Sequence, residues 1–222
     1  MDRDRTLKDS WDRNAGNWTR VVRDGLIPSR RAGTDAAILA AIAECSPRWL
    51  LDIGCGEGWL VRAAEGIAGC AGVGIDGSAA LIAAAQAADS VNRYAVLDYE
   101  TFVSGDDDIG ADFDVAVFNY ALFAEDIAPL LRAAASRLAP GGTLIIQTLH
   151  PTGQGDDGWR NEDFSAFAGG DWAAMPWYSR TLESWQRALS DAGLALLETR
   201  EPRADDGKVL SLLMVCRRGK QQ

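Results

Sequence analysis

Residues 49–58 read WLLDIGCGEG, an apolar run that ends in three glycines spaced two residues apart. The apolar run has the length of a short buried strand. Glycines at 54, 56 and 58 allow the backbone to turn sharply, and a ligand can approach them without meeting a Cβ atom. A helical pattern follows from Leu60 to about Ala68. The stretch therefore predicts a strand, a glycine turn and a helix, with the turn open to a ligand.

The same alternation of strands and helices continues on both sides of this unit. Apolar runs predict further strands, and 3.6-residue periodicity predicts further helices. The strands are expected over 71–75, 94–97, 113–118 and 143–149, the helices over 9–24, 34–44, 79–89, 126–138 and 182–192, and a final hairpin over 194–197 and 209–215. The helix over 126–138 is expected to stop at Pro140-Gly141-Gly142. Such alternation is typical of an α/β, doubly wound, mostly parallel sheet with helices on both faces.

The composition is that of a globular protein with an acidic surface. The chain has 222 residues, 47% of them hydrophobic and 24% charged, and a net charge of −10. This charge argues against a general nucleic-acid partner, because phosphate backbones select basic surfaces. The first ten residues form no apolar signal segment, and no apolar run approaches the length of a bilayer span. We therefore expect a cytoplasmic protein with no membrane partner.

Cysteine and histidine usage predicts no metal site. The four cysteines are scattered without a CxxC pair, and His150 is the only histidine. Tetrahedral zinc sites need such ligands clustered at short spacings. Reduced thiols are the expected state of the cysteines.

Acidic residues follow the next two predicted strands. In an open α/β sheet the ligand crevice lies at the carboxyl ends of the strands. Asp76 follows Gly54 by 22 residues, where an acid can accept both ribose hydroxyls of a nucleoside. Asp98 ends the third strand, next to the expected place of an adenine ring. The alternative for both acids is that they only cap loops.

The glycine spacing favours a nucleoside without a pyrophosphate. A dinucleotide site is typically G-x-G-x-x-G, whereas this turn is G-x-G-x-G, with Trp59 too bulky for close strand–helix packing. Glu57 in the turn is expected to repel a pyrophosphate. A nicotinamide-dependent oxidoreductase and a non-catalytic nucleoside-binding module remain as alternatives to a nucleoside-using enzyme.

Taken together, these segments resemble the class I S-adenosylmethionine-dependent methyltransferases. The segments that carry the resemblance are LDIGCGEG at 51–58, GIDGS at 74–78, VLDYE at 96–100, DFDVAVFNYALF at 112–123 and LRAAASRLAPGGTLIIQTL at 131–149. They cover about residues 48–149, and the last predicted helix and hairpin also look like that family. The resemblance implies a seven-stranded sheet of order 3-2-1-4-5-7-6 with strand 7 antiparallel. It also implies S-adenosyl-L-methionine as cofactor and S-adenosyl-L-homocysteine as product.

The resemblance implies a set of cofactor-binding residues. Gly54 and Gly56 would lie against the methionine part, and Leu81 would pack on the adenine. Asn119 would lie beside the methyl-bearing sulfur. Asp76 would bind the ribose hydroxyls, and Asp98 with the Tyr99 backbone would read the adenine edge. The cofactor-binding residues expected in all are Trp18, Gly54, Gly56, Asp76, Gly77, Leu81, Asp98, Tyr99 and Asn119.

We expect one domain over 1–222, made of a helical cap (1–33), a cofactor-binding core (34–149), an aromatic lid (150–180) and a C-terminal helix and hairpin (181–222). The lid segment has no clear periodicity but holds six of the chain's 18 aromatic residues, namely Trp159, Phe164, Phe167, Trp172, Trp177 and Tyr178. Long segments of this kind are usually functional, and the aromatic density disfavours disorder. A small satellite core is the alternative to a substrate lid.

The cap is locally basic, with eight Lys or Arg against five Asp in residues 1–31. It is either a solvated helix or a cover for an anionic group such as a ligand carboxylate. Trp11 and Trp18, on one face of its helix, either close the pocket or pack in a core.

An aromatic pocket predicts a small organic acceptor, methylated at oxygen or else at nitrogen. His150, directly after the fifth strand, is the expected general base, with a structural role as the alternative. Tyr120 is a second polar group with an expected catalytic role. The expected protein is a monomer or homodimer whose partner is the small-molecule acceptor.

Overall fold

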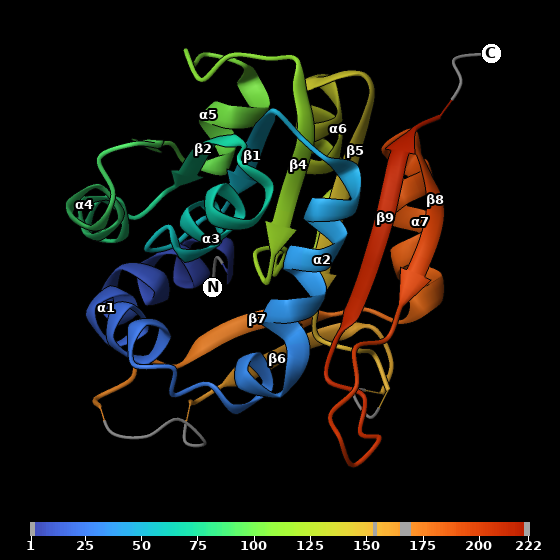
Figure 1. The fold of residues 1–222 in the computed structure, drawn as a ribbon. Coiled ribbons are helices and arrows are strands. Elements are labelled where there is room, and N and C mark those ends of the chain that lie inside the picture. Colours follow the sequence, from blue (N-terminus) through green and yellow to red (C-terminus); the bar gives the residue numbers. More distant parts are fainter. Residues whose placement is uncertain (1–2, 153–154, 165–169, 220–222) are drawn as a thin grey trace.

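The computed structural model describes residues 3–152, 155–164 and 170–219, and its centre is a seven-stranded sheet (Figure 1). The strands are β1 (Trp49–Ile53), β2 (Ala71–Asp76), β3 (Arg93–Val96), β4 (Phe113–Asn119), β5 (Leu138–Thr148), β8 (Leu194–Arg200) and β9 (Leu212–Arg218). Their order is β3-β2-β1-β4-β5-β9-β8, and β9 is antiparallel to both of its neighbours. This confirms the predicted order 3-2-1-4-5-7-6, since β8 and β9 are the sixth and seventh strands of the sheet.

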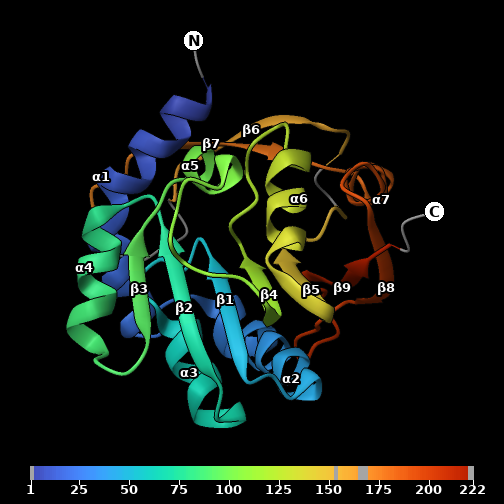
Figure 2. The same ribbon diagram turned by 90° about the horizontal axis from the view of Figure 1, so that it is seen from above.

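Helices cover both faces of the sheet, as predicted. They are α1 (Arg3–Arg23), α2 (Asp35–Cys45), α3 (Trp59–Ala68), α4 (Ala79–Ala88), α5 (Tyr99–Ser104), α6 (Ala128–Ser136) and α7 (Leu182–Asp191), with a π-helical turn η1 (Arg30–Thr34) before α2. Helices α2, α3 and α4 pack on one face, while α5, α6 and α7 pack on the other (Figure 2). Neighbouring residues of a strand enter opposite cores: Leu50 packs with the first set of helices and Leu51 with the second.

The bounds of several elements differ from the sequence-based expectation. Helix α1 begins at Arg3 rather than at 9, β5 begins at Leu138 rather than at 143, and the last strand is Leu212–Arg218 rather than 209–215. Helix α6 ends at Ser136, earlier than the glycine-rich stop, because Leu138 already pairs with Phe113 in the sheet. Helix α5 was not expected from the sequence. The Asp98 carboxylate caps α5 by accepting the N–H of Thr101 at 3.0 Å, a local hydrogen bond that six residues of weak periodicity do not reveal.

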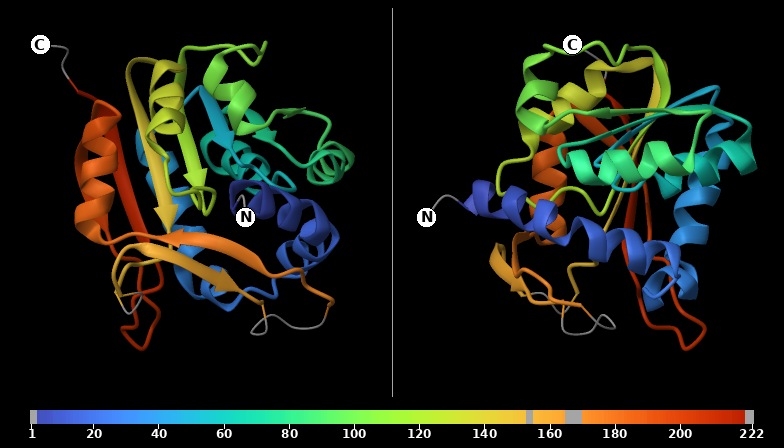
Figure 3. Two further views of the ribbon diagram at one scale, coloured as in Figure 1. Left: turned by 180° about the vertical axis from the view of Figure 1, so that it is seen from behind. Right: turned by 90° about the vertical axis from the view of Figure 1, so that its left-hand side faces the viewer.

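The segment between β5 and α7 contains a second, two-stranded sheet. Strands β6 (Gly158–Glu162) and β7 (Met175–Ser179) pair antiparallel, although this segment showed no strand period. The hairpin lies beside α1, below the edge at which β4 and β5 end (Figures 1 and 3). Of the predicted lid aromatics, Phe167 lies outside the described residues. No helix in the described part of the chain is both long and apolar enough to span a bilayer.

Candidate functional site

The glycine turn between β1 and α3 needs residues without a side chain. Gly54 and Gly56 have φ values of 79° and 57°, in the left-handed region that favours glycine. A Cβ on Gly54 would lie 2.6 Å from both the Ala121 Cβ and the Tyr99 Oη, so the space there is already filled. A Cβ on Gly56 would meet nothing within 4 Å. The turn is therefore closed by protein at Gly54 and open at Gly56.

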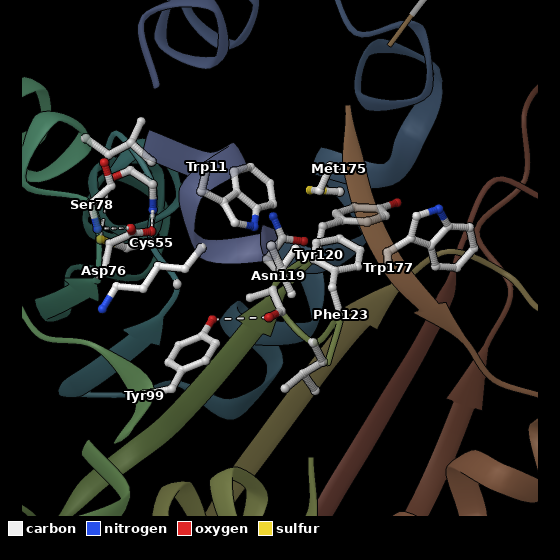
Figure 4. A pocket seen from close by; sticks show the side chains of 18 of the residues that line it. Trp11, Cys55, Asp76, Ser78, Tyr99, Asn119, Tyr120, Phe123, Met175 and Trp177 are labelled. Atoms are coloured by element: carbon white, nitrogen blue, oxygen red, sulfur yellow. Dashed lines mark hydrogen bonds between the residues drawn. The ribbon is translucent and has the colours of Figure 1, made fainter. Parts of the chain in front are cut away.

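Asp76 holds this turn against the end of β2. Its two carboxylate oxygens accept hydrogen bonds from the Gly56 N–H and the Ser78 N–H, each at 2.9 Å (Figure 4). Burial raises the pKa of Asp76, and the two backbone hydrogen bonds oppose that shift. Each carboxylate oxygen has a second lone pair, so Asp76 can also accept hydroxyl groups of a ligand.

Asp98 is a helix cap that also faces the same space. It accepts hydrogen bonds from the N–H and the hydroxyl of Thr101, and its second oxygen pairs with Lys8 of α1 at 2.9 Å. These hydrogen bonds, with that from the Thr101 N–H the largest effect, lower the pKa of Asp98 to about 2. Asp98 therefore stays ionised and links β3 to α1.

Glu57 is buried and fully paired. Its carboxylate lies 2.8 Å from both Arg62 of α3 and Arg23 of α1. The predicted repulsion of a pyrophosphate by Glu57 loses its basis, because two guanidinium groups balance the charge. The same contacts join α1 to the glycine turn.

Asp52, in the middle of the buried β1, lies close to Asp76. Its Oδ1 has no hydrogen-bond partner among the described residues. Burial, with the charge of Asp76 as a second cause, raises the pKa of Asp52 to about 8. The side chain is thus predominantly protonated at neutral pH, and the turn carries one charged acid fewer than its sequence suggests.

We expect the contribution of Asp52 to the stability of the protein to fall with rising pH. The raised pKa means that the protonated carboxyl stabilises the fold at low pH, and this contribution is lost as the pH rises from about 4 towards 8. The Asp52→Asn variant lacks this titration. Its unfolding free energy relative to wild type should therefore rise by about 2 kcal/mol between pH 5 and about pH 6.5, at about 1.4 kcal/mol for each pH unit. Urea denaturation at several pH values measures this difference, and parallel pH profiles would contradict it.

A cavity of about 870 Å³ opens at the carboxyl ends of the strands. Ten of the eleven residues predicted for the site line it: Trp18, Gly54, Gly56, Asp76, Gly77, Leu81, Asp98, Tyr99, Asn119 and Tyr120. Figure 4 shows Asp76 and Ser78 on one side, Phe123 and Trp177 on the other, and Asn119 between them. The volume lies at the upper end of the range for small-molecule sites. It offers space for two groups placed end to end.

Asn119 and Tyr120 lie between the glycine-turn side and the aromatic side of the cavity, and each has polar neighbours. The Asn119 Oδ1 accepts a hydrogen bond from Gln147 at 3.0 Å. Tyr120 follows with φ = 54°, an unusual conformation for an aromatic residue. Its phenol lies beside the hydroxyls of Ser211 and Thr34, and burial raises its pKa. Tyr120 is therefore a protonated donor at neutral pH rather than a base.

A cluster of aromatic side chains and one methionine, Met175, forms the far side of the cavity. Its aromatic members are Trp11, Trp18, Tyr120, Phe123, Phe164, Trp172 and Trp177. Trp11 lies 5.4 Å from Trp18 and 6.0 Å from Phe123, measured between ring centroids. Trp18, predicted to bind the cofactor, thus packs in this cluster. Sequence reasoning did not select Phe123, Met175 or Glu162, which also line the cavity. The position of Phe123 in the sequence, shortly after the fourth strand, indicates that it could line the cavity.

Helix α1 and the hairpin cover the cavity and are tied together. The Asn14 side chain donates to the Ala173 carbonyl and accepts from the Ala173 N–H, both at 2.8 Å. The Tyr178 N–H donates to the Phe123 carbonyl at 2.8 Å, which fixes β7 to the segment after β4. The buried Arg180 guanidinium donates to the carbonyls of Ala124 and Glu125 in that segment. The cover is therefore built from two distant parts of the chain.

His150 is the predicted site residue that does not line the cavity. Its Nδ1 accepts the Thr152 N–H at 3.0 Å, and its Nε2 lies 3.3 Å from Glu201. The Nδ1 thus faces the segment after β5, and the Nε2 faces the loop between β8 and β9. The structure does not bring the imidazole to the cavity that holds the other predicted residues.

We therefore expect the His150→Gln variant to keep its turnover within about twofold of wild type, because a base must lie within hydrogen-bond reach of the acceptor. A methyl-transfer assay of both proteins at saturating cofactor tests this. A loss beyond about a hundredfold, with cofactor affinity unchanged, would restore His150 as the general base.

The chain matches several known methyltransferases. A family model described as a methyltransferase domain matches residues 30–199. An S-adenosylmethionine-dependent methyltransferase from Mesorhizobium loti is 25% identical, with a TM-score of 0.62 over 82% of this chain and 96% of that one. No curated protein matches the sequence.

Two further solved structures share the fold at lower identity. The 1,6-didemethyltoxoflavin-N1-methyltransferase of Burkholderia thailandensis, solved with 1,6-didemethyltoxoflavin and S-adenosylhomocysteine, is 19% identical. Its TM-score is 0.68 over 98% of this chain and 89% of that one. A chain of the complex between the Haloferax volcanii Trm112 methyltransferase activator and a methyltransferase is 19% identical, with a TM-score of 0.71 over 97% and 99% of the two chains. Since the family model covers most of the sequence, the chain belongs to the methyltransferase-domain family, within the class I S-adenosylmethionine-dependent methyltransferases.

Proposed function

We propose that the protein transfers the methyl group of S-adenosylmethionine to a nitrogen or oxygen of a small organic molecule. One observation carries the proposal: a single covered cavity joins the glycine turn to an aromatic cluster. The first side suits the cofactor, and the second suits an acceptor placed next to it. The cover formed by α1 and the β6–β7 hairpin limits the acceptor to a small molecule.

The residues on the first side fit an adenosine-bearing cofactor. The open space at Gly56 leaves room for the methionyl part, and the Asp76 carboxylate can accept ribose hydroxyls. Leu81 offers an apolar surface for the adenine, and Asp98 with the Tyr99 backbone lies at its edge. When bound, the cofactor supplies a methyl group on a positively charged sulfur.

Arg30 is our candidate for the cofactor carboxylate. Its Nε donates to both oxygens of Asp35, at 2.8 and 3.0 Å, and its guanidinium lies 4.0 Å from the Trp59 ring centroid. The terminal nitrogens have no hydrogen-bond partner among the described residues, and Arg30 lines the cavity. A guanidinium held in this way is preorganised to bind a carboxylate. In this proposal the basic N-terminal segment covers an anionic group, the carboxylate of the cofactor, and is not only a solvated helix.

On the acceptor side, the protein's contribution is alignment and exclusion of water. Methyl transfer is an in-line displacement, so the acceptor atom must be held near Asn119 and opposite the sulfur. The tryptophans and Phe123 can hold a small apolar body, and the cover keeps water away from the reacting atoms. Tyr120 has its phenol beside the hydroxyls of Ser211 and Thr34, so its ring is the part that it offers to the acceptor.

Two measurements test the proposed function. Calorimetry of the wild-type protein with S-adenosylhomocysteine should give saturable binding, and the absence of binding would reject the proposal. A screen of amines, phenols and carboxylates with radiolabelled S-adenosylmethionine should give methylated product. Cofactor binding without transfer to any of these acceptors would favour the non-catalytic nucleoside-binding module. The family assignment gives no support to the nicotinamide alternative.

A further inference from the structure

The acceptor side of the cavity presents aromatic rings to a ligand. Trp11, Tyr120 and Trp177 line the cavity and are each only partly buried, so part of each ring stays open to it (Figure 4). The face of an aromatic ring carries negative electrostatic potential and attracts cations, most strongly for tryptophan. This wall favours a positively charged ligand over a negatively charged one.

A carboxylate stands on the same wall. Glu162 of β6 lines the cavity and pairs directly across the hairpin with Met175 of the aromatic cluster, so the two side chains share one face. The Glu162 Oε1 accepts the Phe164 N–H at 2.8 Å, which fixes the carboxylate, and the Oε2 has no partner among the described residues. Glu162 is therefore a half-buried carboxylate that is fixed by one hydrogen bond and has its second oxygen available to a ligand.

Free positive charge is scarce around the cavity. Of the cationic side chains that line it in the described part of the chain, Lys8 is paired with Asp98, Arg5 has an interaction partner, and Arg30, beside Trp59, is the residue proposed for the cofactor carboxylate. An anionic acceptor would meet no free counter-charge on this side.

We propose that the acceptor is an amine that binds as its ammonium ion, with its charge against the aromatic rings and the free oxygen of Glu162. This inference rests on the proposed methyl transfer and narrows its substrate class. Before transfer, the ammonium gives one proton to Glu162 or to water. The nitrogen lone pair then forms the new N–C bond to the methyl group while the S–C bond breaks. The electron pair of that bond remains on sulfur, and the positive charge passes to the methylated nitrogen.

The experiment compares three probes of nearly equal shape, namely benzylamine, benzyl alcohol and benzoate. Their dissociation constants are measured by calorimetry on the protein saturated with S-adenosylhomocysteine. Benzylamine should bind at least about tenfold more tightly than either other probe, as expected when an aromatic surface and a carboxylate act together on a cation.

Three variants test which side chains cause the preference for benzylamine. Glu162→Gln keeps an oxygen for the Phe164 N–H but removes the charge, and should weaken benzylamine binding about fivefold to tenfold while leaving benzyl alcohol unchanged. Trp177→Leu keeps an apolar side chain but removes the ring, and should also weaken benzylamine more than benzyl alcohol. Glu183→Gln, an exposed carboxylate of α7 paired with Arg187 and away from the cavity, is the matched control and should change nothing.

The proposal is overturned if benzylamine binds no better than benzoate or benzyl alcohol, including the case in which none of them binds. It is also overturned if Glu162→Gln and Trp177→Leu both match the wild type. Affinity for S-adenosylhomocysteine, measured for the same samples, shows whether each variant is folded. Loss of that affinity in the wild type would instead reject the proposed function itself.

Discussion

The Asp76→Ala variant should bind S-adenosylhomocysteine at least about a hundredfold more weakly than the wild type. The substitution removes the acceptor of two backbone hydrogen bonds, those from Gly56 and Ser78, and with it the proposed acceptor for the ribose hydroxyls. Hydrogen bonds to a charged group contribute about 1.5–3 kcal/mol each, and a hundredfold corresponds to about 2.7 kcal/mol. Calorimetry of both proteins with the same ligand measures the loss.

Asp114 provides a matched control for this experiment. One of its carboxylate oxygens accepts the Arg48 N–H at 2.8 Å and the Trp49 N–H at 3.0 Å, at the start of β1 and away from the cavity. Asp114→Ala therefore removes a similar pair of backbone contacts, but its ligand affinity should stay within about twofold of wild type. If both variants lose affinity equally, Asp76 acts through stability alone. Unchanged affinity in Asp76→Ala would contradict its role in binding.

A methyl group added at Gly54 should strongly destabilise the protein. Gly54→Ala imposes a left-handed conformation on a residue with a Cβ, which costs about 1–2 kcal/mol. It also places that Cβ 2.6 Å from the Ala121 Cβ and the Tyr99 Oη, and overpacking costs typically about 1–3 kcal/mol more. Urea denaturation should show a loss of about 2–5 kcal/mol in unfolding free energy.

Gly56→Ala separates the two causes. Gly56 also has a positive φ, but its added Cβ would meet nothing within 4 Å and would enter the cavity. We expect a stability loss of only about 1–2 kcal/mol, from the backbone conformation alone, with a clear loss of ligand affinity. Equal stability losses in the two variants would mean that the crowding at Gly54 has no energetic consequence. Full ligand affinity in Gly56→Ala would remove the methionyl part of the cofactor from that side of the turn.

Much of the cofactor side could be predicted because its signals are local. Glycines between a strand and a helix, and acids at strand ends, follow from the connection of each strand to the next element. Parallel pairing then brings Gly54, Asp76 and Asn119 to one edge without any further information. Asp98 could be placed at that edge in the same way, but its pairing with Lys8 could not, since 90 residues separate the two.

The acceptor side could be predicted only in outline. The aromatic density of residues 150–180 indicated a cover, but the strands β6 and β7 were not visible in the sequence. Most of their residues are only partly buried, so the alternation between apolar and polar residues that marks a strand is weak. The sequence predicts His150 as the base because it is the only imidazole and follows β5. The direction in which the His150 imidazole points depends on the loop that carries Glu201, which is far along the chain.

The amino-acid sequence by itself determined the order of strands, the ligand-binding edge of the sheet and the family, because hydrophobic period and turn residues act over a few neighbours. Only the tertiary structure decided which groups around the cavity remain available. Glu57 is neutralised by Arg23 and Arg62, and Asp52 is protonated by burial, whereas Glu162 keeps one free oxygen. Charge pairing and desolvation depend on distances between residues far apart in the chain, and folding alone sets those distances.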